Sequence, residues 1–163
     1  MGHMQGAGKF LSAAALLAAV LSATPALADG VSVSGAVQNP AQYSMADLRA
    51  LAATDVTVSQ ATDHGTFAGS FHGVLLWTLI DKSAPIDAPG KNTFLRHTVL
   101  VSSSGDQYAV AVSEGEIHPK LENKLVILAT DENGAPLTAP LLIVPGDARA
   151  SRAVKAVTNV TVQ

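Results

Sequence analysis

The sequence contains no cysteine, few aromatic side chains and fewer basic than acidic residues. Without cysteine the chain forms no disulfide and offers no thiolate as a nucleophile or a metal ligand. Aromatic residues make up 4% of its 163 residues, and the formal net charge is −3 at pH 7. Because nucleic-acid binding depends on neutralising phosphates with basic side chains, this composition argues against nucleic acid as a partner. We therefore expect a fold that is held together by its hydrophobic core alone.

The single long apolar run, Phe10–Leu21, lies near the start of the chain and has the features of an export signal. Lys9 precedes it, and Ala26–Ala28 has the small-x-small pattern of a cleavage site. The run is shorter than the roughly 20 residues that span a bilayer. We predict that residues 1–28 are a tag scar and a cleaved signal peptide. Residues 29–163 then form a single domain that is periplasmic or secreted and keeps no stable membrane anchor; a retained anchor is the alternative.

The remainder of the chain alternates short β-rich runs with a few short helical patterns. Ser44 with Asp47 predicts the capped start of a helix that extends to Ala52. Apolar residues at helical spacing predict a second helix over Gly73–Lys82, and Glu114–His118 predicts a helical turn. Strands are expected at 31–37, 56–58, 66–71, 94–101, 107–112, 125–128, 141–144 and 157–162. This order predicts an α+β fold, with β-rich mixed or antiparallel sheets and two or three short helices.

The C-terminal tail is the strongest candidate for a binding site. Apolar residues lead into a Pro145-Gly146 turn, and three cations, Arg149, Arg152 and Lys155, follow within seven residues. Such a turn frees backbone N–H groups, and arginine binds phosphate through paired hydrogen bonds. A helical turn would place Arg152 and Lys155 on one side. We predict an anion site formed by Gly146 and these cations; the alternative is solvated cations paired with nearby carboxylates.

A second candidate is a metal site formed by Asp63, His64 and His72. Imidazole nitrogen and carboxylate oxygen suit zinc or copper, and a catalytic zinc site needs three protein ligands. The spacing matches no known metal-binding signature. The alternative is that His64 is a turn histidine and His72 a histidine at the end of a strand.

Two further groups have ordinary structural explanations beside the chemical ones. Paired carboxylates among Asp106, Glu114 and Glu116 would supply acid–base chemistry if they shared a pocket. Asp106 beside Gly105 is typical of a hairpin turn, and the two glutamates suit the start of a helical turn. Trp77 would stack on a ligand, or anchor its helix in the core.

Three segments together resemble the sulfite-oxidase-like, molybdopterin-binding oxidoreductase domain. Phe71–Trp77 resembles the family's F-x-G-V-x-L-W segment. Gly105–Tyr108 followed by Glu116–Pro119 resembles its D-G-Y hairpin with an acidic residue before a proline. Val144–Asp147 with Ser151–Lys155 is similar to its V-P-G … A-R-x-V-K signature. The resemblance covers nearly all of the predicted domain and implies a sulfite-oxidase molybdopterin-domain-like fold.

The family carries molybdenum on a pterin, with a cysteine bound to the metal and basic residues on the pterin phosphate. Arg152 and Lys155 match the phosphate-facing tail. The family's cysteine would be expected near the turn Thr62–Gly65, where this chain has no thiolate. Oxidoreductase activity is thus implied by the resemblance alone, and we expect no bound cofactor, although molybdopterin is what the family carries.

Two functions are compatible with these observations. The first is an exported, non-catalytic ligand-binding member of this family, with a small anion or a pterin phosphate at its C-terminal tail. The alternative is a protein-interaction subunit of a periplasmic or membrane-associated complex, whose partner would be another protein. A polar pocket near the Pro145-Gly146 turn would favour the first function, and a flat apolar face would favour the second.

Overall fold

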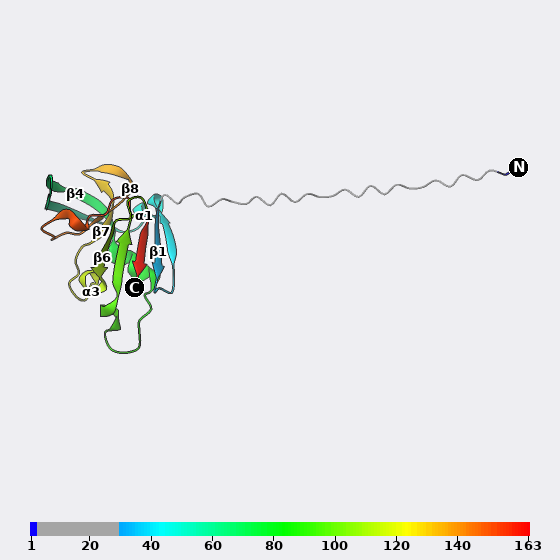
Figure 1. Ribbon diagram of the computed structural model, residues 1–163, viewed down its shortest axis with the longest axis horizontal. Coiled ribbons are helices and arrows are strands. Elements are labelled where there is room, and N and C mark those ends of the chain that lie inside the picture. Colours follow the sequence, from blue (N-terminus) through cyan, green and yellow to red (C-terminus); the bar gives the residue numbers. More distant parts are fainter. Residues whose placement is uncertain (3–29) are drawn as a thin grey trace.

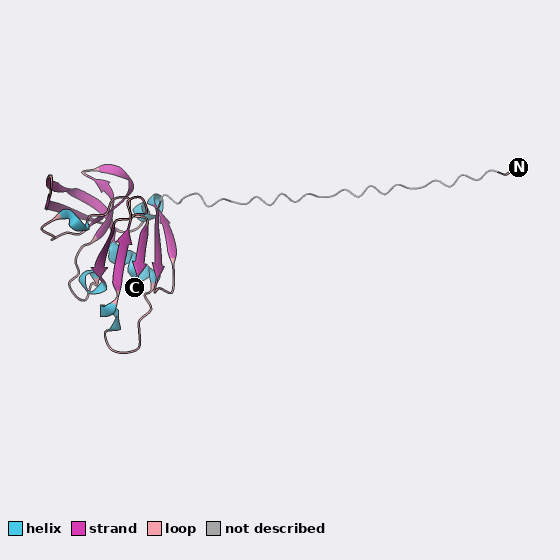
Figure 2. Ribbon diagram, viewed as in Figure 1, coloured by secondary structure: helices cyan, strands magenta, loops and turns pink. Residues whose placement is uncertain are grey.

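The computed structural model describes residues 1–2 and 30–163, and it consists of two β-sheets with short helices (Figures 1 and 2). The predicted signal peptide and its cleavage site lie outside the described residues. The strands are β1 (Gly30–Gly35), β2 (Ala41–Ser44), β3 (Ala53–Thr62), β4 (Gly65–Leu75), β5 (Thr98–Ser102), β6 (Ala109–Ser113), β7 (Ile127–Glu132), β8 (Ala135–Ile143) and β9 (Asn159–Val162). This arrangement confirms the predicted α+β class with mixed and antiparallel sheets.

The five-stranded sheet has the order β2-β1-β9-β5-β6. β1 and β9 pair in parallel, although they lie at opposite ends of the domain's sequence, and all other pairs are antiparallel. The predicted hairpin between β5 and β6 is present. Its first strand begins at Thr98 and not at Phe94, because Thr93–Arg96 forms a 3-10 helix (η1).

The four-stranded sheet is antiparallel and has the order β3-β4-β7-β8. β3 and β4 pair over their whole length, whereas β7 pairs with β4 only from Phe71 to Leu75. The distal part of the β3–β4 hairpin therefore extends beyond the other strands as a two-stranded ribbon, at the left of Figure 1. β7 and β8 are joined through Asn133 and Gly134, which have φ of 50° and 79°. An Asn-Gly pair suits this left-handed hairpin turn.

The helices begin where local side chains allow. In α1 (Met45–Ala50) the Asp47 N–H donates to Ser44 Oγ at 3.1 Å, and the Ser44 N–H donates to Asp47 Oδ2 at 2.8 Å, so the predicted capping box is present. α2 spans Leu76–Ser83 and not Gly73–Lys82. Gly73 belongs to β4 because it pairs with Ala129 of β7. The two strands approach so closely there that only glycine fits.

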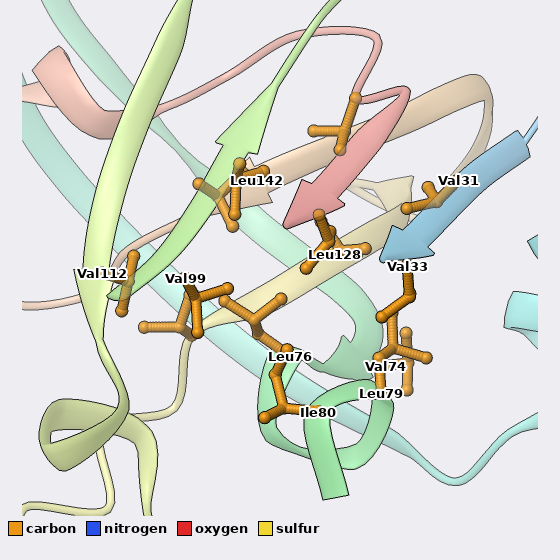
Figure 3. Close-up of a cluster of buried hydrophobic side chains, with 14 of the residues drawn as sticks. Val31, Val33, Val74, Leu76, Leu79, Ile80, Val99, Val112, Leu128 and Leu142 are labelled. Carbon is orange, nitrogen blue, oxygen red and sulfur yellow. The ribbon is translucent and has the colours of Figure 1, made fainter. Parts of the chain in front are cut away.

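The main core lies where α2 packs against both sheets. Leu76, Leu79 and Ile80 of α2 are fully buried, and Figure 3 shows them beside valines of the five-stranded sheet. A smaller apolar cluster around Phe71 and Ile127 lies on the face of the four-stranded sheet that is opposite the main core. Among the described residues, no helix is long and apolar enough to cross a membrane.

Candidate functional site

The C-terminal tail lies beside the end of β3, although more than 80 residues separate them in the sequence. The Ala61 N–H donates to the Ala148 carbonyl at 3.0 Å, and Ala61 forms a parallel bridge with Arg149. The chain then turns into a 3-10 helix, η2 (Ala150–Arg152). The β3–β4 turn and the tail, which the sequence singled out separately, therefore form one surface.

A groove of about 250 Å³ opens between these two segments. Its lining residues are Ala61, Thr62, Asp63, Tyr108, Arg149, Ala150 and Ser151. The Arg149 guanidinium donates to the Asp63 carboxylate, and the Tyr108 hydroxyl donates to the Ser151 carbonyl. The side chains of Arg149 and Asp63 are 54% and 84% exposed, so this ion pair faces water and its net contribution to stability is small.

Arg152 does not point to a free anion site, because two carboxylates already bind it. Its Nε and Nη2 donate to the two oxygens of Asp147 at 2.8 and 2.7 Å, and its Nη1 donates to Glu116 Oε2 at 3.2 Å. Lys124 Nζ also donates to Glu116 Oε2, at 3.2 Å. The side chain of Arg152 is 26% exposed, so this is a partly buried network of four charges.

The pKa values of this network shift in the directions that its hydrogen bonds require. The hydrogen bonds that Arg152 donates to Asp147 lower the pKa of Asp147, and the same bonds raise the pKa of Arg152. Burial raises the pKa of Glu116, but donors from Ser113, Lys124 and Arg152 outweigh it, so the net pKa is lowered. The charged forms of all these groups are therefore favoured in the fold.

Lys155 lies at a different place from Arg152. The 3-10 helix ends at Arg152, so no helical turn places the two cations on one side, and that prediction is wrong. Lys155 instead lines a separate cavity of about 450 Å³ together with Phe67, Leu137 and Leu141. Gly146 has a φ of 85° and forms the predicted turn, with no heavy atom within 4 Å of the position that a Cβ would take.

The residues of the predicted metal site have separate partners. Asp63 contacts Arg149, the His64 N–H donates to Thr62 Oγ1 at 3.2 Å, and His72 Nδ1 lies 2.8 Å from Asp55 Oδ1. Within residues 1–2 and 30–163 no three His, Asp or Glu side chains form a group able to hold a metal ion. The structure therefore does not bring the three predicted ligands together.

The sequence did not reveal several polar partners. His97 Nδ1 lies 2.6 Å from Glu114 Oε2, and both side chains are buried. Seventeen residues separate them, and only the pairing of β5 with β6 brings them together, so no local pattern signals the contact. Tyr108 lines the groove, and in the sequence it stands out only as the last residue of the Gly105–Tyr108 motif. Asp106 accepts a hydrogen bond from the Tyr108 N–H at 3.0 Å, as a turn residue does.

The side chains of the groove do not fit thiolate-bound molybdenum. They offer hydroxyl, carboxylate and guanidinium groups, and the whole sequence contains no cysteine. None of these groups is the thiolate that the resembled family binds to its metal. The cation that remains accessible in the groove, Arg149, suits an anion and not a metal.

Comparisons with known proteins give a likeness of fold. No protein-family model matches the sequence, and no curated protein matches it. The structure of the sulfane dehydrogenase SoxCD from Paracoccus pantotrophus superposes with a TM-score of 0.65 at 16% sequence identity. The match covers 82% of this chain and 37% of that chain, so the chain spans little more than a third of the enzyme's length. This likeness confirms the predicted fold class, an α+β domain of the type found in this dehydrogenase.

Proposed function

We propose that the protein is an exported, non-catalytic domain that binds a small anion, such as a phosphate group, beside Arg149. The observation that carries this proposal is the meeting of two segments. The turn after β3, where the family's metal ligand would be expected, lies against the tail that resembles the family's phosphate-facing signature. We infer that the groove between these segments receives a ligand, although the sequence lacks the thiolate.

Arg149 is the residue best suited to receive the anion. Its guanidinium is half exposed and its partner, Asp63, is more exposed still. An exposed ion pair of this kind contributes only about 0–1 kcal/mol, so an incoming anion displaces the carboxylate at little cost. The Tyr108 hydroxyl lies at the same groove, and its single O–H would have to leave the Ser151 carbonyl to donate to an oxyanion.

The proposal includes export and the absence of redox catalysis. Export rests on Lys9, the apolar run after it and the Ala26–Ala28 pattern. N-terminal sequencing of the exported protein is expected to begin at Asp29, and retention of Lys9 would contradict it. The absence of molybdenum chemistry rests on the missing thiolate. Elemental analysis of protein from its own host is expected to find no stoichiometric molybdenum.

The anion site is tested by a thermal-shift titration with phosphate and with sulfate at constant ionic strength. A ligand that binds only the folded state stabilises it by about 2.7 kcal/mol at a hundredfold excess over its dissociation constant. We expect the melting temperature of the parent to rise with phosphate concentration. Arg149→Gln is expected to lose this rise.

Arg96→Gln is the matched control. Arg96 is an exposed arginine on η1 and forms no ion pair with any residue that the structure describes. This variant removes one positive charge and leaves the groove intact, so it is expected to respond to phosphate as the parent does. Equal responses of all three proteins would mean a general salt effect and would contradict the site. A Lys155→Gln variant that alone loses the response would move the site to the neighbouring cavity.

A further inference from the structure

The outer side of β3 is an unguarded sheet edge as far as Ser59, and the tail covers it at Ala61. β3 is the first strand in the order β3-β4-β7-β8, and its ten residues pair with β4 without a register shift. Its sequence, Ala53–Thr62, contains no proline and no basic residue, and Asp55 is its one charge. Proteins usually protect an edge strand with lysine, proline, a bulge or a covering segment, because unpaired backbone groups recruit another strand.

The hydrogen bonds show which backbone groups face outward. The Ala61 N–H donates to Ala148, on the side away from β4, so the odd-numbered residues of β3 direct their backbone groups outward. Beyond Ala61, the backbone N–H groups of Asp55, Thr57 and Ser59 have no partner in the part of the chain that the structure describes. Asp55, Thr57 and Ser59 are alternate residues of β3, and their outward backbone groups can pair with a further strand.

One face of β3 is polar and exposed and the other is apolar and buried, as in a strand inside a larger sheet. The side chains of Asp55, Thr57 and Ser59 are exposed, whereas Val56 and Val58 are buried with exposed fractions of 7% and 6%. A strand added at this edge in antiparallel orientation would continue both faces, polar beside polar and valine beside valine. Such cross-strand pairs are what stabilises a sheet.

We propose that this edge binds the β3 edge of a second copy of the chain. The two strands pair in antiparallel orientation about a two-fold axis at Thr57, which joins two four-stranded sheets into one of eight strands. Thr57 then lies opposite Thr57 of the second copy, and Asp55 lies opposite Ser59. An interface of this type uses the same surface on both copies, as two-fold symmetry requires.

The register follows from charge and from the hydrogen bonds already made. A two-fold axis at Asp55 would place two carboxylates directly opposite each other, which destabilises a sheet. An axis at Ser59 would require the backbone of Ala61, which Ala148 already engages. An axis at Val56 would make the two Asp55 carboxylates diagonal neighbours on one face, and an axis at Val58 would pair Asp55 with the engaged Ala61. An axis at Thr57 keeps the two carboxylates apart, and the pairing of Thr57 with Thr57 and of Asp55 with Ser59 ends before it reaches Ala61.

Single cysteines test the register directly, because the chain contains no other cysteine. Residues that face each other in a hydrogen-bonded antiparallel pair have Cα atoms about 5.5 Å apart, within the range of a disulfide. Under mild oxidation we expect Thr57→Cys to form a covalent dimer. Asp55→Cys and Ser59→Cys are expected to cross-link efficiently with each other when mixed, and poorly when each is alone. Ala68→Cys, on the exposed face of β4 opposite Ser59, is the control and is expected to stay uncoupled.

Opposite charges at one position test the same contact without a covalent bond. Sedimentation of the full chain over about a hundredfold range of concentration is expected to show a monomer–dimer equilibrium in the parent. Thr57→Lys and Thr57→Glu are each expected to be monomeric, because like charges then face each other across the axis. Their mixture is expected to recover the dimer. Ala68→Lys is expected to dimerise as the parent does.

Several results would overturn the proposal. A parent that stays monomeric throughout the concentration range would do so, whether the edge is open or covered by another part of the chain. A dimer that tolerates Thr57→Lys, or a mixture of Lys and Glu variants that stays monomeric, would place the interface elsewhere. Cross-linking of Ala68→Cys as fast as that of Thr57→Cys would indicate random collision. Far-UV circular dichroism confirms that each variant is folded before its mass is interpreted.

Discussion

Arg152 binds Asp147 through two parallel hydrogen bonds, Nε to Oδ2 at 2.8 Å and Nη2 to Oδ1 at 2.7 Å. The two residues lie on either side of the start of η2, so this bidentate pair closes the turn that follows β8. Glu116 accepts a further hydrogen bond from Arg152 and ties the tail to α3 (Glu114–Ile117). Arg152 is therefore a structural residue of the tail, whereas the side chain of Arg149 remains accessible to solvent.

Arg152→Gln is expected to destabilise the fold by about 1.5–3 kcal/mol, the range for hydrogen bonds to charged groups. The loss arises because two partly buried carboxylates stay desolvated and lose the hydrogen bonds from Arg152, of which Asp147 loses both of its own. Arg149→Gln removes an exposed ion pair and is expected to change the free energy of unfolding by less than about 1 kcal/mol. Denaturant unfolding at pH 7 measures both. If the two substitutions lowered the free energy of unfolding equally, the hydrogen bonds of Arg152 would contribute no more than an exposed ion pair.

The same network makes stability depend on pH in the acid range. The pKa values of Asp147 and Glu116 are lowered in the fold from ordinary values of 3.8 and 4.5. A lowered pKa contributes stability that is complete above the ordinary value and is lost as the pH falls through the folded value. We expect Asp147→Asn to be less stable than the parent at pH 7, and the difference to shrink progressively below about pH 4.

Unfolding free energies measured between about pH 7 and about pH 3 give this difference. Arg96→Gln is the control, because arginine stays protonated throughout the range and its effect is expected to be constant. A difference between parent and Asp147→Asn that does not change with pH would exclude the carboxylate as the titrating group.

The core prediction concerns Leu79 on α2. Its side chain is fully buried between the two sheets, so Leu79→Ala is expected to lower stability by about 2–4 kcal/mol through lost burial and a residual cavity. Asp81→Ala, at an exposed position of the same helix, is expected to stay within about 0.5 kcal/mol of the parent. A loss below about 0.5 kcal/mol for Leu79→Ala would mean that α2 does not pack as described.

Gly73→Ala tests the close approach of β4 and β7. A Cβ at this position would lie 2.2 Å from the Leu128 carbonyl oxygen and 2.5 Å from the Ala129 Cα. Both are backbone atoms and cannot rotate away, so the strands must separate, and we expect a loss of about 1–3 kcal/mol or more. At Gly105 the nearest atom is 3.6 Å away, so Gly105→Ala is expected to be nearly neutral. Thermal unfolding of both variants measures this difference, and a Gly73→Ala variant as stable as Gly105→Ala would contradict the close approach of the two strands.

Short-range patterns were sufficient wherever the interacting residues are neighbours in the sequence. The Ser44–Asp47 capping box spans three residues, and the Asp106 turn spans two, so the sequence predicted both. The start of α2 was predicted three residues too early. Leu75 has the periodicity of the helix, but β7 pairs with β4 up to this residue and holds it in the strand.

The absence of cysteine, the α+β class and the apolar positions of the core were determined by the sequence alone, because they depend on composition and local periodicity. Tertiary structure decided which charges meet. Arg149 reaches Asp63 across 86 residues and Arg152 reaches Glu116 across 36, whereas Lys155, three residues further on, lines another cavity. Because the three tail cations are close in the sequence, they were expected to act together. The fold places each of them beside a different segment, so they do not form one site. The same strand order leaves β3 at an edge, which no local pattern reveals.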